Sequence, residues 1–513
     1  MMQRRGGPHA SVRQRGWRVP MMLALGLAAA TLTPVAGAAP SSAPARAVSP
    51  QIQAHSEQAV SIGGRTFSVD AEVGQFPVAS GPGRTDATAG YISYSVAAGR
   101  EVAGRPVLFV FNGGPGAASA FLHMGALGPM RAHVPQNPAA PLPDAAPVSV
   151  NPATLLDIAD LVFLDPPGTG FSRIDPGADH GFYRSVRGDA DAVAQAALAW
   201  LTTHGRSGAN VYLLGESYGT IRAAAMVGAL HARAPDLRIG GVLLLGQALN
   251  MIETSQRPDN VVAYPVALPT LAAVACYHHR RPRPCDPAAS AAEASAFAPA
   301  YLQALFRGRS LTPATRNAVA ARLHDLTGIP RAYYLAHDLR ISKEQFRTRL
   351  LDAQGKVLGR YDARYTAPRA PSSGEIVGPD AFGPVSDLYA GAVLDQLRRL
   401  GVDDPSEYRV IARTEGDWSY GAGDSPFNDW PFMAELERQM TAMPAMRLFV
   451  GTGLYDLTTT VGAADYLFAQ SSLSAGRYRN HRYPAGHVAY SDDRSWQQMI
   501  VDIRAFLAAD RRP

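Results

Sequence analysis

A serine flanked by glycines lies between a predicted strand and a predicted helix, in the motif Gly215-Glu216-Ser217-Tyr218-Gly219. An apolar run at residues 211–214 precedes the motif, and a helical pattern follows from about residue 220. Such a turn is too sharp for flanking side chains, and it exposes the serine hydroxyl above the sheet. The helix N-terminus also favours developing negative charge. The motif therefore predicts Ser217 as a nucleophile rather than a member of an ordinary Ser/Gly turn.

A serine is a poor nucleophile until an oriented base removes its proton. In hydrolases built around such a turn, the order along the chain is Ser, then Asp or Glu, then His. Asp456 follows the apolar run at residues 447–450, and His487 follows a strand-like segment at residues 479–483. Taken alone, Asp456 is also consistent with a helix N-cap and His487 with a turn. The order after Ser217 favours a catalytic triad.

The loop Asn112-Gly113-Gly114-Pro115-Gly116 directly follows the apolar run at residues 106–111. Acyl transfer needs backbone N–H groups that point at the developing oxyanion, and glycine lets the backbone approach the substrate closely. Beside an exposed serine, we expect this loop to contribute to an oxyanion hole rather than to form a plain turn.

Together these motifs resemble the serine carboxypeptidase family (peptidase family S10), in the family's order and over about residues 105–490. A further matching motif is Asp165-Pro166-Pro167-Gly168-Thr169-Gly170-Phe171-Ser172. The resemblance implies an α/β-hydrolase fold and a serine carboxypeptidase that releases C-terminal residues from peptides through an acyl-enzyme. It implies Ser217 as nucleophile, His487 as general base and acid, and Asp456 as the group that orients the histidine.

The resemblance also implies the groups that bind the substrate. The oxyanion donors fall on the backbone N–H groups of Gly114 and Tyr218, and the substrate's C-terminal carboxylate is bound through Asn112, Gly113 and Glu216. A carboxylate needs hydrogen-bond donors, so Glu216 takes part only when it is protonated. We expect burial to raise the pKa of this side chain, which would favour activity at acidic pH.

Several positions depart from the family pattern. Ala117 and Thr459 stand where the family has cysteines, and Thr220 stands where it has a glycine after the serine motif. Val488 replaces the methionine after the histidine. Ala126 stands where eukaryotic members can carry an acid that pairs with the glutamate of the serine motif. These departures resemble the bacterial branch of the family, which implies a location in the periplasm or the medium.

The elements that must position these residues alternate between apolar strands and helical patterns. Antiparallel strands are predicted between residues 59 and 98, and helices at residues 189–200 and 220–232. Buried strands are predicted at residues 106–111, 161–164, 211–214, 241–245 and 447–450. This alternation predicts an α/β protein with a mainly parallel, doubly wound sheet.

Residues 251–375 break the alternation, because they hold helical patterns but no convincing central strand. We predict a helical lid insertion over this interval, at the carboxyl edge of the sheet. The hydrolase core would then have a first part at residues 56–250 and a second part at residues 376–513.

Residues 1–38 have the order of a secretory signal peptide, with five arginines, an apolar run at residues 19–30 and the sequence Ala36-Gly37-Ala38. An N-terminal membrane anchor is the weaker alternative, because the apolar run is too short to span a bilayer comfortably. We expect cleavage, export to the periplasm or the medium, a flexible linker at residues 39–55, and no stable membrane insertion afterwards.

Composition excludes further classes of protein. The 513 residues are 47% hydrophobic and 18% charged, which suits a large folded core rather than disorder. The five arginines of residues 1–38 account for the whole net charge of +5. The rest of the chain is formally neutral, which argues against binding of nucleic acid. The resemblance instead implies peptide or protein C-termini as partners, and the oligomeric state stays open.

Cys276 and Cys285 are the only cysteines of the chain. In an oxidising compartment, a disulfide between them would close a short surface loop and contribute about 2–3 kcal/mol. His278 and His279 lie in this loop, but their spacing lacks the pattern of a zinc site. We therefore expect no metal and no cofactor.

Two alternative functions stay open. An esterase or acyltransferase on the same scaffold would keep the triad, but it would have no need for Asn112 and Glu216 to capture a free carboxylate. A non-catalytic binding protein would have no need for a complete triad.

Overall fold

The computed structural model describes residues 49–96, 104–257, 259–369, 380–412, 418–421 and 432–508. The predicted signal peptide at residues 1–38 lies outside the described residues, as does most of the predicted linker. The linker prediction is wrong at its end, because strand β1 (Gln51–Ile62) already begins at Gln51. Gln51 lies opposite Gln75 of the neighbouring strand, so backbone pairing orders a segment whose composition indicated a linker.

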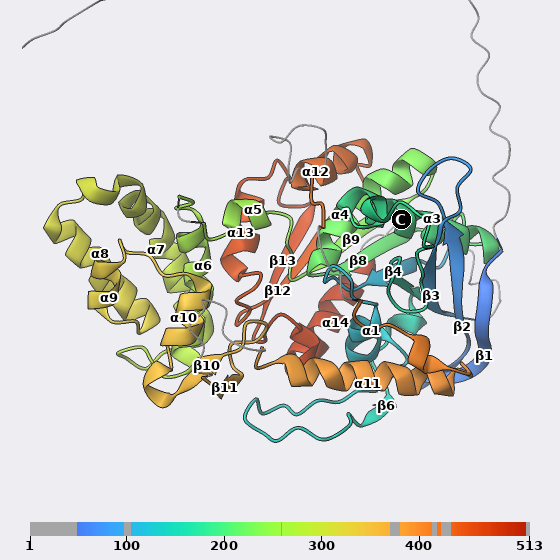
Figure 1. Ribbon diagram of the computed structural model, residues 1–513, viewed down its shortest axis with the longest axis horizontal. Coiled ribbons are helices and arrows are strands. Elements are labelled where there is room, and N and C mark those ends of the chain that lie inside the picture. Colours follow the sequence, from blue (N-terminus) through green and yellow to red (C-terminus); the bar gives the residue numbers. More distant parts are fainter. Residues whose placement is uncertain are drawn as a thin grey trace, which may run out of the picture. The chain divides into compact units, whose positions relative to one another are not determined.

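A nine-stranded sheet forms the centre of the part of the chain that the structure describes (Figure 1). Its order is β1-β2-β3-β7-β4-β8-β9-β12-β13. Pairing is antiparallel from β1 to β7 and parallel from β7 to β13. Beyond β1, the strands are β2 (Arg65–Val78), β3 (Ala87–Val96), β4 (Val107–Phe111), β7 (Asp160–Asp165), β8 (Val211–Glu216), β9 (Ile239–Leu245), β12 (Arg447–Gly453) and β13 (Tyr478–Tyr483). The five buried strands predicted from apolar runs are all members of the parallel part.

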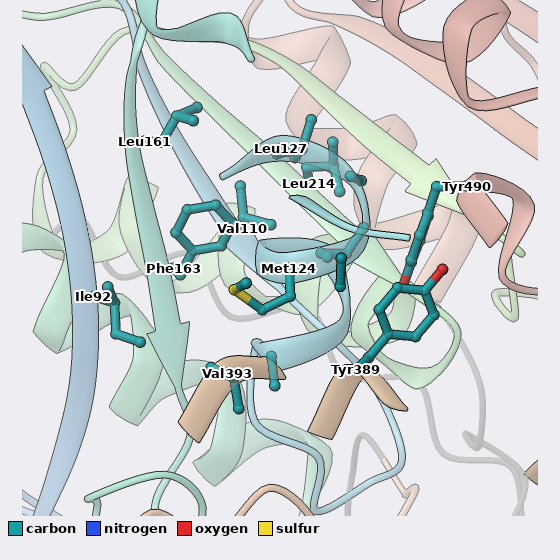
Figure 2. Packing of buried hydrophobic residues seen from close by; sticks show 14 of the residues in the cluster. Ile92, Val110, Met124, Leu127, Leu161, Phe163, Leu214, Tyr389, Val393 and Tyr490 are labelled. Carbon is teal, nitrogen blue, oxygen red and sulfur yellow. The ribbon is translucent and has the colours of Figure 1, made fainter. Parts of the chain in front are cut away.

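Helices cover both faces of the sheet, because successive side chains of a buried strand point to opposite sides. Val110 packs on the face covered by α11 and α14, and Phe109 packs on the face covered by α3, α4 and α12 (Figure 1). Figure 2 shows Val110 and Phe163 of the first cluster beside Met124. The helices of the core are α1 (Ala120–Leu122), α2 (His180–Tyr183), α3 (Val186–Thr203), α4 (Tyr218–Arg233), α11 (Gly383–Arg399), α12 (Phe432–Ala442), α13 (Val461–Ala469) and α14 (Asp493–Ala508). Two small strands, β5 (Met130–Ala132) and β6 (Val148–Val150), form a separate hairpin.

The described residues of the interval 251–375 add no strand to the central sheet. They form α5 (Met251–Thr254), α6 (Ala263–Tyr277), α7 (Pro287–Arg307), α8 (Pro313–Thr327), α9 (Arg331–Ala336), α10 (Lys343–Arg349) and a hairpin of β10 (Lys356–Leu358) and β11 (Thr366–Pro368). These elements, called the lid below, have an apolar cluster of their own. That cluster includes Leu454, Tyr455 and Leu457 from the segment after β12, so the lid and the core share buried contacts there.

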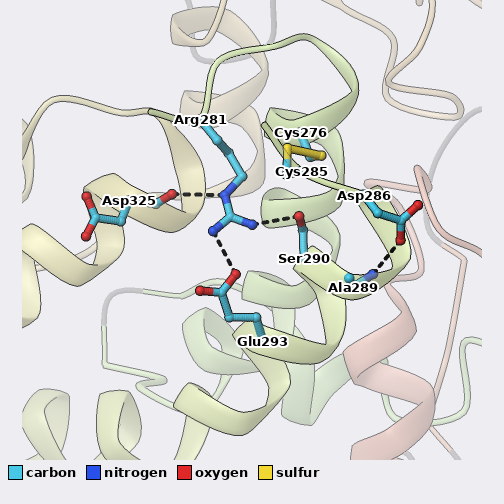
Figure 3. Close-up of a disulfide and its surroundings, with 8 residues drawn as sticks. All are labelled: Cys276, Arg281, Cys285, Asp286, Ala289, Ser290, Glu293 and Asp325. Carbon is cyan, nitrogen blue, oxygen red and sulfur yellow. Dashed lines mark hydrogen bonds and ion pairs between the residues drawn. A yellow bond between two sulfur atoms is a disulfide. The ribbon is translucent and has the colours of Figure 1, made fainter. Parts of the chain in front are cut away.

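A disulfide joins Cys276 in α6 to Cys285, two residues before α7 (Figure 3). Arg281, within the loop that the bridge closes, donates to the carbonyl of Asp325 at 3.0 Å and to the side chains of Ser290 and Glu293. His278 donates from Nε2 to the carbonyl of Ala363 at 2.7 Å. Side-chain contacts as well as the bridge therefore hold this loop to the rest of the lid.

No helix in the described part of the chain is both long and apolar enough to cross a bilayer.

Candidate active site

Ser217 lies at the turn between β8 and α4, with φ 58° and ψ −127°. A positive φ is unfavourable for a residue with a side chain, and the surrounding contacts must hold it. The N–H of Ser217 donates to the carbonyl of Leu245 at the end of β9 (2.9 Å), and the Thr220 hydroxyl donates to the carbonyl of Ser217 (2.6 Å). A Cβ on Gly215 would collide with the carbonyl of Gly219, so the flanking glycines are sterically required.

His487 and Asp456 form a buried pair beyond the ends of β13 and β12. The imidazole donates from Nδ1 to Oδ2 of Asp456 at 2.6 Å, and the two residues are 4% and 0% exposed. Thr459 donates to the same carboxylate from its hydroxyl (2.6 Å) and from its backbone N–H (3.0 Å). Thr459, one of the positions that depart from the family pattern, therefore holds the aspartate in place through two hydrogen bonds.

The protonation of His487 follows from this pairing. Burial lowers the pKa of the imidazole, but the charge and hydrogen bond of Asp456, with the charge of Glu216, outweigh burial and raise it. Because Nδ1 donates to Asp456, Nε2 is the nitrogen left to accept a proton from the nucleophile. Nε2 is buried and has no hydrogen-bond partner among the described residues.

Ser217 and His487 approach the same point at the end of β9. A Cβ on Gly246 would lie 2.9 Å from Cε1 of His487, so the ring packs directly on this glycine, which has φ 56°. Gly246 follows Leu245, whose carbonyl accepts from Ser217. The three segments that carry the triad therefore meet at one edge of the sheet. Sequence reasoning missed Gly246, although a glycine directly after a predicted buried strand was a signal.

The Asn112–Gly116 loop packs against the serine turn. A Cβ on Gly113 would lie 2.6 Å from the backbone nitrogen of Tyr218, and Gly114 has φ 102°. Tyr218 is the first residue of α4, so its N–H has no acceptor within the helix. The structure thus brings together the two backbone segments to which the oxyanion donors, Gly114 and Tyr218, were assigned.

Asn112 and Glu216 form a second buried pair beside the triad. Asn112 donates from Nδ2 to Oε1 of Glu216 at 2.8 Å, and its own Oδ1 accepts from the N–H of Leu122 at 3.0 Å. Burial raises the pKa of Glu216 to about 7, against the opposing effects of His487, Tyr490 and Asn112. This carboxyl therefore keeps its proton at mildly acidic pH, which is what a donor to a carboxylate requires.

A buried arginine that sequence reasoning missed supports both loops. Arg222 of α4 donates to Asp189 of α3 (2.7 Å) and to the carbonyl of Asn112 (2.6 Å). The Tyr218 hydroxyl donates to the same carboxylate at 3.0 Å. The available signal was a charged residue on the otherwise apolar face of each predicted helix.

Residues 360–365 of the lid bridge the two loops that carry His487 and Asp456. The carbonyl of Tyr361 accepts from the N–H of His487 at 2.6 Å, and the carbonyl of Arg360 accepts from the N–H of Leu457 at 3.1 Å. Tyr361 is 40% exposed, and the centroid of its ring lies 5.2 Å from that of the His487 ring. This segment had no motif in the sequence, and only the structure reveals its position.

Residues 86–249 match the family model described as serine carboxypeptidase. The match includes the glycine-rich loop and the serine motif and ends before Asp456. No curated protein matches the chain in sequence.

Among solved structures, the chain is similar to Kex1(delta)p, a prohormone-processing carboxypeptidase from Saccharomyces cerevisiae. The TM-score is 0.51 at 13% identity, over 86% of this chain and 91% of that one. It is also similar to proline iminopeptidase from Mycobacterium smegmatis (TM-score 0.34, 14% identity, 89% and 100% covered) and to a thermophilic esterase from Thermogutta terrifontis (TM-score 0.33, 14% identity, 85% and 98% covered). The first of these similarities, with the mainly parallel sheet, confirms the predicted α/β-hydrolase fold.

Proposed function

Since residues 86–249 belong to the serine carboxypeptidase family, we propose that this protein is an exported enzyme that releases C-terminal residues from peptides through an acyl-enzyme. The protein is a serine-type hydrolase of the carboxypeptidase class. The observation that carries the proposed specificity is the buried Asn112–Glu216 pair beside Ser217, in which Glu216 Oε2 has no partner among the described residues. An enzyme that ignores the substrate's C-terminus has no need of this pair.

In the proposed mechanism, His487 accepts the proton of Ser217 through Nε2 as the serine oxygen attacks the scissile carbonyl carbon. The N–H groups of Gly114 and Tyr218 stabilise the negative charge on the carbonyl oxygen. His487 then gives its proton to the leaving amine as the C–N bond breaks. A water molecule, deprotonated by the same imidazole, hydrolyses the resulting ester and restores Ser217.

The C-terminal carboxylate of the substrate would be held by donors from two segments. Asn112 and the N–H of Gly113 supply two of them, and protonated Glu216 supplies a third. A charge-assisted hydrogen bond to a carboxylate contributes about 1.5–3 kcal/mol. Loss of the Glu216 proton replaces this attraction with repulsion between two carboxylates.

The direct test compares a peptide that has a free C-terminus with its C-terminal amide, using the purified protein and mass spectrometry of the truncation ladder. We expect stepwise loss of residues from the free peptide and at least about tenfold slower cleavage of the amide, since each 1.4 kcal/mol is a factor of ten. Equal rates on both would contradict the exopeptidase specificity and favour the esterase or acyltransferase alternative.

Ser217→Ala tests the nucleophile in the same assay. Removal of a triad serine costs roughly 10⁶-fold in kcat, and the loss of one hydroxyl from the half-buried Ser217 leaves core packing intact. We expect no detectable turnover with an unchanged thermal unfolding transition. Activity above about one thousandth of wild type would exclude Ser217 as the nucleophile.

Glu216→Gln tests the role of the raised pKa. Wild-type activity on the free peptide should fall above about pH 7, where Glu216 loses its proton. The glutamine amide donates at any pH, so the variant should lose this alkaline fall. An unchanged alkaline limb would mean that another group titrates.

Export is supported by the arginine-bearing, apolar order of residues 1–38. The Cys276–Cys285 bridge suits an oxidising compartment. Sequencing of the N-terminus of the protein recovered outside the cytoplasm should read from Ala39. Recovery of the uncleaved chain from the cytoplasm alone would contradict export.

A further inference from the structure

Tyr490 lies three residues after His487 and is fully buried, yet the mechanism above gives it no role. Its hydroxyl lies next to the Glu216 carboxyl and the Asn112 amide. The hydroxyl oxygen and Glu216 Oε2 are both buried without a hydrogen-bond partner among the described residues. Two unpaired polar groups side by side in a buried place point to a contact between them, because each is costly when left alone.

The surroundings of Tyr490 hold its backbone and its ring in place. Arg131 donates to the carbonyl of Tyr490 at 3.0 Å and stacks over the Trp496 ring at 3.9 Å. A Cβ on Gly125 would lie 2.5 Å from the Tyr490 ring, so the π-helical turn His123–Leu127 packs directly against it. On another side, the Tyr389 ring of α11 packs edge to face, with centroids 6.0 Å apart (Figure 2).

Resting on the function proposed above, we propose that Tyr490 is a positioning residue of the carboxylate-binding site. Its hydroxyl donates to Oε2 of Glu216, orients that carboxyl toward the substrate, and sets the pH above which capture of the substrate's C-terminus fails. In this role Tyr490 acts through Glu216 and takes no part in the proton transfers between Ser217 and His487. Eukaryotic members of the resembling family can carry an acid that pairs with this glutamate, at the position where this chain has Ala126. In this chain, Tyr490 would support Glu216 instead.

The other groups that act on Glu216 come from several elements. His487 and Asn112 favour the ionised carboxylate, and Asp456 opposes it. Tyr361 of the lid and Tyr389 of α11 also lie within electrostatic range of Glu216. A hydroxyl that donates to a carboxylate favours ionisation, so removal of the Tyr490 hydroxyl should shift the loss of the Glu216 proton to higher pH.

The test is Tyr490→Phe, with Tyr389→Phe as the matched control that also removes one buried tyrosine hydroxyl. Profiles of kcat/KM would be measured from about pH 5 to 9 on a peptide with a free C-terminus. The same profiles would be measured on an N-blocked amino-acid ethyl ester, which the triad can hydrolyse but which has no carboxylate. For Tyr490→Phe on the peptide, we expect the alkaline limb to move up by about one pH unit and KM to rise at least about fivefold.

On the ester, Tyr490→Phe should stay within about twofold of wild type, since the triad is untouched. Tyr389→Phe should leave the alkaline limb on the peptide in place. An unmoved limb in Tyr490→Phe, or the same movement in Tyr389→Phe, would overturn the role of Tyr490. Parallel losses on peptide and ester would do the same, because they would indicate general distortion.

A second measurement separates coupling from distortion. In the Glu216→Gln background, the change Tyr490→Phe should leave the pH profile where it is, because the titrating group has gone; a further movement would overturn the proposal. The wild-type enzyme distinguishes the two levels of inference. If the wild type cleaves the free peptide and its amide equally, the proposed function fails. If it discriminates between them but Tyr490→Phe changes nothing, only the role of Tyr490 fails.

Discussion

Asp456 is held by residues that take no part in the chemistry. Oδ1 accepts from the backbone N–H groups of Thr458 and Thr459, and Oδ2 accepts from the Thr459 hydroxyl and from His487. With both oxygens occupied, the carboxylate cannot rotate away from the imidazole. The orientation of the general base therefore depends on a threonine hydroxyl as well as on the aspartate.

This contact predicts the effect of Thr459→Val, which keeps the shape but removes the hydroxyl. A hydrogen bond to a charged group contributes about 1.5–3 kcal/mol, so kcat/KM should fall about tenfold or more. Thr458→Val is the matched control, because the Thr458 hydroxyl is buried without a partner among the described residues. Kinetics on one peptide substrate would check both, and equal losses would contradict the role given to Thr459.

The residues predicted from sequence are those whose local pattern carries information. Ser217 was predicted because its strand–turn–helix context is contiguous, and His487 and Asp456 because each follows a strand. Tyr490, Arg222 and Gly246 act through neighbours in space that lie far away in sequence. Arg222, for example, reaches the carbonyl of Asn112 across 110 positions. No periodicity or spacing along a single chain encodes such a contact.

At the scale of elements, α3 and α4 are joined by an ion pair that water does not reach. The side chains of Arg222 and Asp189 are 0% and 2% exposed. Arg222 also lies over the rings of Tyr218 and Phe111, with its guanidinium 5.2 Å and 5.4 Å from the two centroids. One side chain thus links the helix that begins at Tyr218, the strand that leads to Asn112 and the helix that carries Asp189.

Arg222→Met should therefore be strongly destabilising. Removal of one partner leaves the Asp189 carboxylate buried without a counter-charge, which costs about 3–5 kcal/mol. Urea unfolding followed by circular dichroism would measure the loss. The double variant Arg222→Met with Asp189→Leu should recover part of the stability, because no charge is then left unpaired. A double variant as unstable as the single one would contradict this explanation.

The buried strands of the sheet and the helices α3 and α4 were predicted because their patterns of apolar residues are strong and continuous. Residues 360–365 were not, since they form neither a regular element nor a motif. Two of their contacts with the loops of His487 and Asp456 come from backbone carbonyls, which every residue type supplies. The start of β1 was missed for a similar reason, because strand pairing overrode a composition typical of a linker.

For the whole molecule, Glu216 links proton binding to folding. Burial raises its pKa from 4.5 to about 7, so the native state binds this proton more tightly than the unfolded chain does. The resulting stabilisation is fully present below about pH 4.5 and is lost as the pH rises to about 7. The stability lost between these two pH values amounts to roughly 3 kcal/mol.

Urea titrations of the wild type and of Glu216→Gln would measure this loss. The free energy of unfolding of the wild type, relative to that of Glu216→Gln, should fall by about this amount between pH 4.5 and about pH 7. A difference that stays constant with pH would show that Glu216 does not titrate differently in the two states.

The apolar cluster of the lid contains Leu454, Tyr455 and Leu457, all within two residues of Asp456. A rigid-body movement of the lid away from the sheet would therefore also move Asp456 and break its hydrogen bond to His487. A lid exchanged for that of a related protein would leave the triad intact only if it packed on these three side chains in the same way.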